Sequence, residues 1–279
     1  MIFKKNRIIH SKDKKPILYD VYYNETEKPQ PIVIFCHGYK GYKDWGAWHL
    51  VAEAFTDAGF CFLKFNFSHN GGTMEDPIDF PDLEAFAENN FSLELDDLDR
   101  VLKEIESRNE NFPKKISTIS LIGHSRGGGI VLIKAEEDTR ISKVVTWASV
   151  SDFKARFQED TEGFELWKET GVTHVENSRT KQMLPHNFQF YIDFKENENR
   201  FSINRAVKNL KIPQLIVHGI DDPTVSLKEA KAIHSWNPQS ELKIIEEADH
   251  VFNAKHPWEE AALPNQLKTV VERTIEFLK

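Results

Sequence analysis

The residues best suited to chemistry form the pentapeptide Gly-His-Ser-Arg-Gly at positions 123–127. An apolar-rich run, 119–122, precedes it, and a second apolar run, 130–133, follows it. A serine at a sharp strand-to-helix turn is held in a strained conformation that exposes its hydroxyl, and glycines two residues away on each side prevent collisions in the turn. We therefore predict that Ser125 is a nucleophile beside the N-terminus of a helix.

A serine hydroxyl needs a base to take its proton, and that base is normally a neutral histidine held by a carboxylate. Among eleven histidines, His250 stands between the last predicted strand and the last predicted helix. The carboxylate candidates, Asp221 and Asp222, follow the preceding predicted strand. We favour Asp222 because it precedes Pro223, and a residue before proline is pushed into an extended conformation that directs its side chain towards the loop of His250.

Strand-like and helix-like segments alternate along most of the chain. After a predicted N-terminal hairpin (6–11 and 17–23), the apolar strand-like runs are 32–36, 61–67, 117–122, 143–148, 214–218 and 242–245. Helical patterns cover about 48–55, 92–105, 226–235 and 263–278. This order predicts one α/β domain over residues 1–279, with a mostly parallel central sheet and helices on both faces. Ligands bind at the carboxyl ends of such strands, and each of the three candidate residues follows a strand, so we expect them to meet.

Residues 151–205 interrupt this alternation with many aromatic residues among charged ones. An insertion at this point of the chain would lie over the candidate site. Its rings, Phe164 and Trp167 among them, either form an apolar wall for a substrate or only pack the insertion onto the sheet. The sequence leaves both interpretations open.

Composition excludes several other functions. The 279 residues carry 36 basic and 44 acidic side chains, a formal charge of −8, without a basic patch, which argues against nucleic acid or anionic membrane as a partner. No apolar run approaches the ~18 residues that span a bilayer, and the first residues lack the apolar core of a signal peptide, so we expect a cytoplasmic protein. No metal-binding, dinucleotide-binding or P-loop motif occurs, so no metal and no cofactor are expected.

The remaining cysteines and histidines have simpler interpretations. Cys36 and Cys61 fit two buried thiols better than a disulfide, which would require neighbouring strands of correct geometry. His69 either lines the site or stabilises a turn. Seven other histidines fall into two groups, His37, His124 and His218 as residues that orient turns, and His174, His186, His234 and His256 at surface or cap positions.

At its motifs the chain resembles the α/β-hydrolase superfamily. The matching segments are His37-Gly38, the pentapeptide at 123–127, His-Gly-Ile-Asp-Asp222 with Val225, and Ala-Asp-His250, in the family's order and within residues 15–278. Among its subgroups the chain looks most like small-acyl esterases related to cinnamoyl and feruloyl esterases. The dienelactone hydrolases and the serine peptidases of the prolyl oligopeptidase type share the same motifs.

The resemblance implies a cofactor-free serine hydrolase that cleaves small to medium esters through Ser125, His250 and Asp222. It places the oxyanion hole at the backbone N–H groups of Tyr39 and Arg126, and a cap at 151–205. A peptidase or an acyltransferase would use the same triad with a different leaving group or acceptor. A non-catalytic binding protein on this fold is a further alternative. The oligomeric state is not predicted.

Overall fold

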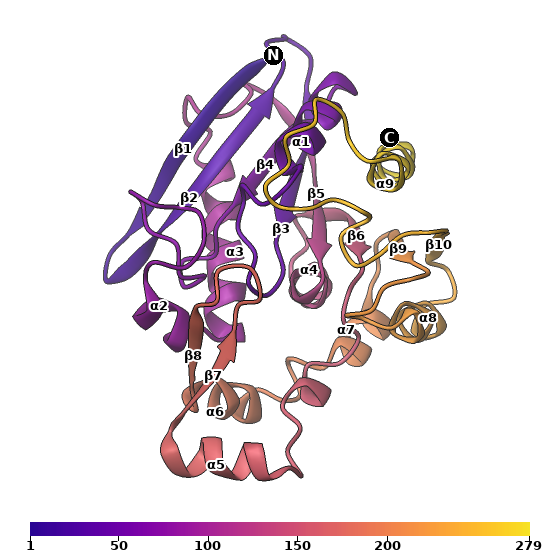
Figure 1. Cartoon of the computed structure of the whole chain (residues 1–279). Helices are drawn as coiled ribbons and strands as arrows, with labels where there is room; N and C mark the ends of the chain where they lie inside the picture. The colour runs from indigo at the N-terminus through magenta and orange to yellow at the C-terminus, as the bar shows by residue number, and fades with distance from the viewer.

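The computed structural model describes all residues, 1–279, and contains an eight-stranded central sheet (Figure 1). The strand order is β1-β2-β4-β3-β5-β6-β9-β10. Only β2 runs antiparallel to its neighbours, so the predicted mostly parallel sheet is confirmed. The strands are β1 (Ile2–Ser11), β2 (Lys14–Tyr23), β3 (Gln30–Cys36), β4 (Cys61–Phe65), β5 (Ile116–His124), β6 (Ile141–Trp147), β9 (Gln214–Gly219) and β10 (Glu241–Ile245).

Helices cover both faces of the sheet, as predicted. One face carries α1 (Trp48–Asp57) and α9 (Asn265–Leu278). The other face carries α3 (Phe91–Glu106), α4 (Arg126–Glu137), α7 (Ile203–Asn209) and α8 (Leu227–Trp236). The N-terminal hairpin and β10 form the two edges of the sheet (Figure 1).

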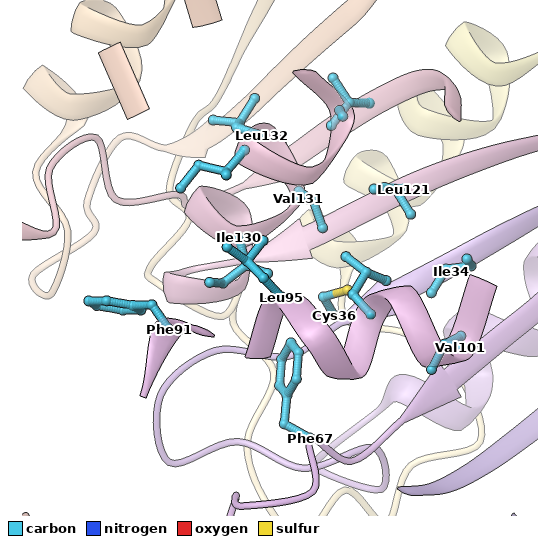
Figure 2. Packing of buried hydrophobic residues seen from close by; sticks show 14 of the residues in the cluster. Ile34, Cys36, Phe67, Phe91, Leu95, Val101, Leu121, Ile130, Val131 and Leu132 are labelled. Atoms are coloured by element: carbon cyan, nitrogen blue, oxygen red, sulfur yellow. The ribbon is translucent and has the colours of Figure 1, made fainter. Parts of the chain in front are cut away.

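The continuous apolar runs form strands because both of their faces are buried. Along β3, Ile34 and Cys36 pack against α3 and α4, whereas Val33 and Phe35 pack on the side of α1. Figure 2 shows the first of these layers, in which side chains of β3, α3 and α4 converge. Burying a side chain of this size contributes about 1.5–3 kcal/mol, so the layered core fixes the strands that carry the candidate site.

Most of the segment between β6 and β9, up to Glu196, forms a small structure of its own. It contains a 3₁₀ turn, η1 (Lys154–Arg156), and α5 (Glu162–Thr170), followed by the antiparallel hairpin of β7 (Val172–Glu176) and β8 (Met183–Asn187), and α6 (Gln189–Glu196). These elements gather at one end of the sheet (Figure 1). The ring of Phe153 stacks on that of Phe91 in α3, with centroids 4.0 Å apart, so aromatic contacts join this segment to the body of the protein.

The structure also bears on two further features of the sequence. The stretch between the predicted strand 61–67 and the predicted helix 92–105, for which no regular element was predicted, contains a short helix, α2 (Leu83–Glu88), whose N-terminus is capped by the side chain of Asp82. Cys36 and Cys61 lie on neighbouring strands, but Cys61 pairs with Ile32 rather than with Cys36, and both thiols are free and buried. None of the helices combines the length and apolar composition that a membrane span requires.

Candidate active site

Ser125 lies in the tight turn between β5 and α4. Its φ of 56° and ψ of −121° are strained for a residue with a side chain. The flanking glycines are required by close contacts. A Cβ on Gly123 would lie 2.3 Å from the carbonyl oxygen of Gly127, and a Cβ on Gly127 would lie 2.5 Å from that of Cys36. The turn therefore needs glycine at both positions, which is the steric reason for the motif.

The structure brings Ser125, His250 and Asp222 into one hydrogen-bonded chain. His250 Nε2 lies 3.0 Å from Ser125 Oγ, and His250 Nδ1 lies 2.8 Å from Asp222 Oδ2. An ionised carboxylate only accepts hydrogen bonds, so Nδ1 carries the proton and Nε2 is the acceptor that faces the serine hydroxyl. In this arrangement the histidine is set to take the proton of Ser125.

Asp222, rather than Asp221, contacts the histidine. The side chain of Asp222 is 0% exposed, and its Oδ1 accepts hydrogen bonds from the backbone N–H groups of Thr224 and Val225. Burial alone would raise the pKa of Asp222, but hydrogen bonds from His218 and His250 hold it well below its ordinary value. Asp221 is exposed, and its backbone N–H binds the carbonyl oxygen of Ala248.

Two buried histidines hold the loops of this chain. His124 Nε2 donates to the carbonyl oxygen of His250, at 2.9 Å, and His218 Nε2 donates to that of Val225, at 2.8 Å. Burial lowers the pKa of His124 to about 3, so this ring is neutral at physiological pH. Both side chains therefore orient turns, which is the role that the sequence predicts for them.

Two free backbone donors lie beside Ser125. A Cβ on Gly38 would lie 2.7 Å from Ser125 Cβ, so the loop after β3 packs directly against the serine. In that loop the N–H of Tyr39 has no acceptor within the chain. Arg126 is the first residue of α4, and a residue at that position has no intrahelical acceptor for its N–H. These are the two groups that the resemblance to the α/β-hydrolases implies as oxyanion donors.

A cavity of about 510 Å³ opens at Ser125. Its wall includes Phe164 and Trp167, so these two residues share the cavity with the candidate nucleophile, although each is only 7% exposed and also packs in the core. Eight of the 19 lining residues carry aromatic rings, and besides Phe164 and Trp167 these are Tyr39, Phe91, Phe153, Phe157, His186 and Phe190. Rings of the 151–205 segment therefore both line the cavity and pack in the core.

The prediction that His186 lies at a surface or cap position is wrong. His186 is 9% exposed and lines the cavity, and its Nε2 lies 2.6 Å from the hydroxyl oxygen of Tyr39. Burial lowers its pKa to about 3. The sequence carries no signal for this contact, because the partner lies 147 residues away. His69, by contrast, binds Ser68 Oγ and does not line the cavity, so it stabilises a turn.

Comparisons with known proteins identify the fold family. A family described as the alpha/beta hydrolase fold matches residues 31–176. No curated protein matches the sequence. Among solved structures, Est1E from Butyrivibrio proteoclasticus is similar, with a TM-score of 0.73 and 15% identity over 99% of this chain and 98% of that one.

Two further solved structures share the fold. The esterase domain of a Rhodothermus marinus protein has a TM-score of 0.66 and 18% identity, and the match covers 100% of both chains. Dienelactone hydrolase from Anabaena variabilis has a TM-score of 0.61 and 16% identity over 98% of this chain and 95% of that one. At these identities the similarity establishes the fold, and the chemistry has to be argued from the site.

Proposed function

Because the chain belongs to the alpha/beta hydrolase fold family, we propose that it is a serine hydrolase that cleaves carboxylic esters of small to medium size. The observation that carries the proposal is the hydrogen-bonded chain in which His250 lies 3.0 Å from Ser125 Oγ and 2.8 Å from Asp222 Oδ2. A strained serine, a histidine in the correct tautomer and a buried carboxylate are the components that nucleophilic acyl transfer requires.

In the proposed mechanism Ser125 Oγ attacks the ester carbonyl carbon while His250 Nε2 takes the hydroxyl proton. The developing alkoxide lies between the N–H groups of Tyr39 and Arg126, each of which contributes about 3–4 kcal/mol of transition-state stabilisation. Collapse of the tetrahedral intermediate breaks the bond to the alcohol, which leaves with the proton from His250. A water molecule, deprotonated by the same histidine, then attacks the acyl-enzyme and releases the acid.

The cavity supports small to medium esters as the substrate class. Its volume of about 510 Å³ falls in the usual range for small-molecule sites. We infer that the 151–205 segment acts as a cap, because Phe164 and Trp167 come from it and line the cavity. Est1E has been solved with ferulic acid bound, and the aromatic lining here makes aryl-substituted acyl groups the first substrates to test.

The test is a panel of p-nitrophenyl esters, from acetate to octanoate and cinnamate, measured beside aminoacyl p-nitroanilides. We expect the wild-type protein to cleave esters with kcat/KM well above that for the anilides, and Ser125→Ala to abolish the activity. A fluorophosphonate probe should form one adduct, on the peptide that contains Ser125. Ester cleavage or labelling that persists in Ser125→Ala would refute the assignment, and preferred cleavage of anilides would indicate a peptidase.

A further inference from the structure

The side chain of Arg126 lines the cavity next to the proposed nucleophile. Its guanidinium carbon lies 5.0 Å from the ring centre of Tyr39 and 5.9 Å from that of Phe190, so two aromatic rings hold the planar group in place. Only Nη2 has a partner within the chain, Glu94 Oε1 at 2.6 Å. The backbone N–H of Arg126 serves the proposed oxyanion hole, and its side chain is therefore available for a separate task.

Several N–H donors of this guanidinium remain unused. Nε and Nη1 of Arg126 have no acceptor in the chain, yet neither is among the fully buried polar atoms that lack a partner. Both atoms are therefore accessible, and the side chain to which they belong lines the cavity. A guanidinium presents its donors as a rigid fork, which suits recognition of a substrate oxygen at a fixed position.

The charge of Arg126 is already balanced. Glu94, on α3 and only 2% exposed, binds Arg126 through Oε1, and the same oxygen accepts a hydrogen bond from Asn89 at 2.9 Å. The other arginine that lines the cavity, Arg156, pairs with Glu229. A substrate carboxylate would therefore add an uncompensated negative charge to an aromatic cavity, whereas an uncharged oxygen would satisfy the free donors at no such cost.

We propose that Arg126 is a specificity-determining residue that selects esters carrying an uncharged oxygen acceptor, such as a keto or ether oxygen, on the acyl group that enters the cavity. This inference rests on the proposed function, because it names the substrate class of the same site. An ester without that oxygen would leave the free N–H donors of Arg126 without an acceptor in an apolar surrounding. A site built to bind a polar group discriminates strongly against analogues that lack it.

The test uses p-nitrophenyl 4-oxopentanoate and p-nitrophenyl 4-methylpentanoate, two esters of similar shape that differ in the keto oxygen. The ratio of their kcat/KM values, divided by the ratio of their rates of alkaline hydrolysis, measures recognition of the oxygen alone. We expect this corrected ratio to be about tenfold to a hundredfold in the wild-type protein, the range for hydrogen bonds to charged groups. The mono-p-nitrophenyl ester of succinate, which carries a carboxylate, should be cleaved more slowly than the keto ester.

The variant Arg126→Lys keeps a cation for Glu94 but loses the fork, so its corrected ratio should fall towards one. Arg205→Lys makes the same change at an arginine that binds Glu136 and does not line the cavity, and it should retain the wild-type ratio. If Arg126→Lys does not fold, the double variant Glu94→Gln/Arg126→Met removes both charges together and should lose the selectivity in the same way.

Three outcomes would overturn the inference. A corrected ratio near one in the wild-type protein, or the same ratio in wild type and Arg126→Lys, would show that Arg126 does not recognise the keto oxygen. Faster cleavage of the succinate ester than of the keto ester would show that the cavity prefers a charged group. Failure of the proposed function looks different, because both pentanoate esters would then react no faster with the wild-type protein than with Ser125→Ala.

Discussion

The substitution Asp222→Asn should lower kcat by about a thousandfold or more, because it reverses the tautomer of His250. The carboxylate uses its two oxygens for different partners. Oδ2 accepts from His250 Nδ1 at 2.8 Å, and Oδ1 accepts from the N–H groups of Thr224 and Val225 at 2.8 and 2.9 Å. An amide has one acceptor oxygen and one NH₂ donor, so it cannot serve both sides.

The hydrogen bonds of the loop decide which way the amide of this variant turns. With its oxygen on the loop side, Asn at position 222 keeps two hydrogen bonds, each with a net value of about 1 kcal/mol, and its NH₂ group faces His250. The opposite orientation would set NH₂ against those two N–H donors and would keep the bond to His250 and the weaker contact with His218, whose Nε2 lies 3.4 Å from Oδ2. The first orientation is the more stable one, so His250 Nδ1 must become an acceptor and Nε2 carries the proton. The ring then has no lone pair for the hydroxyl of Ser125, a defect that costs about 10⁴-fold in the serine-protease template.

The matched control is Asp221→Asn, the same chemical change at the adjacent exposed residue. The side chain of Asp221 makes no contact with the histidine, so its kcat should change by less than about tenfold, under ~1.4 kcal/mol. Both variants would be assayed with one p-nitrophenyl ester at saturation, after circular dichroism and urea unfolding have established matched folding. A loss of less than about tenfold in folded Asp222→Asn, or a larger loss in Asp221→Asn, would refute this account of the acid.

Two further predictions concern the cavity wall and the buried histidines. Trp167→Ala should change the kcat/KM ratio of p-nitrophenyl cinnamate to p-nitrophenyl acetate by about tenfold, since it removes a ring from the cavity. The control is Leu166→Ala, at a residue that is 59% exposed. Equal losses on both esters that follow the loss of thermal stability would support a packing role alone. Burial lowers the pKa of His124 to about 3, whereas an unfolded histidine has a pKa of about 6.5. Its contribution to the free energy of unfolding is therefore complete above pH ~6.5 and falls by about 1.4 kcal/mol per pH unit as the pH drops towards the folded-state value. Urea unfolding at about pH 7 and pH 5 should give a smaller loss in His124→Asn than in wild type, and equal losses would contradict the assignment.

The sheet was predictable because burial on both faces leaves a direct trace in the sequence. The run 32–36 is apolar at every position and the run 119–122 at three of its four positions, and in the structure these runs lie in the paired strands β3 and β5, with Cys36 opposite Gly123. Glycines in the pentapeptide have an equally local cause, since the turn leaves no room for a Cβ. Where one element alone determines a residue type, the sequence is sufficient.

The cavity was less predictable because its wall depends on distant partners. His186 was expected at a surface or cap position and is instead buried against Tyr39, a contact that only the folded 151–205 segment creates. Glu94 occurs in a helical pattern where a charged residue normally faces solvent, and only the position of Arg126 explains its burial. The direction of each ring in this segment is likewise set by long-range packing, for which a single sequence has no local signal.

Tyr39 connects the cap to the proposed chemistry. Its backbone N–H is the predicted oxyanion donor, its ring faces the guanidinium of Arg126, and its hydroxyl binds His186 on β8. On its other side, the loop of Tyr39 is fixed by the buried side chain of Lys43, which pairs with Asp20 of β2 at 2.9 Å. The loop is thus held by the sheet at one end and by the 151–205 segment at the other. Because an oxyanion donor acts only when held in position, we expect this segment to affect turnover as well as substrate choice.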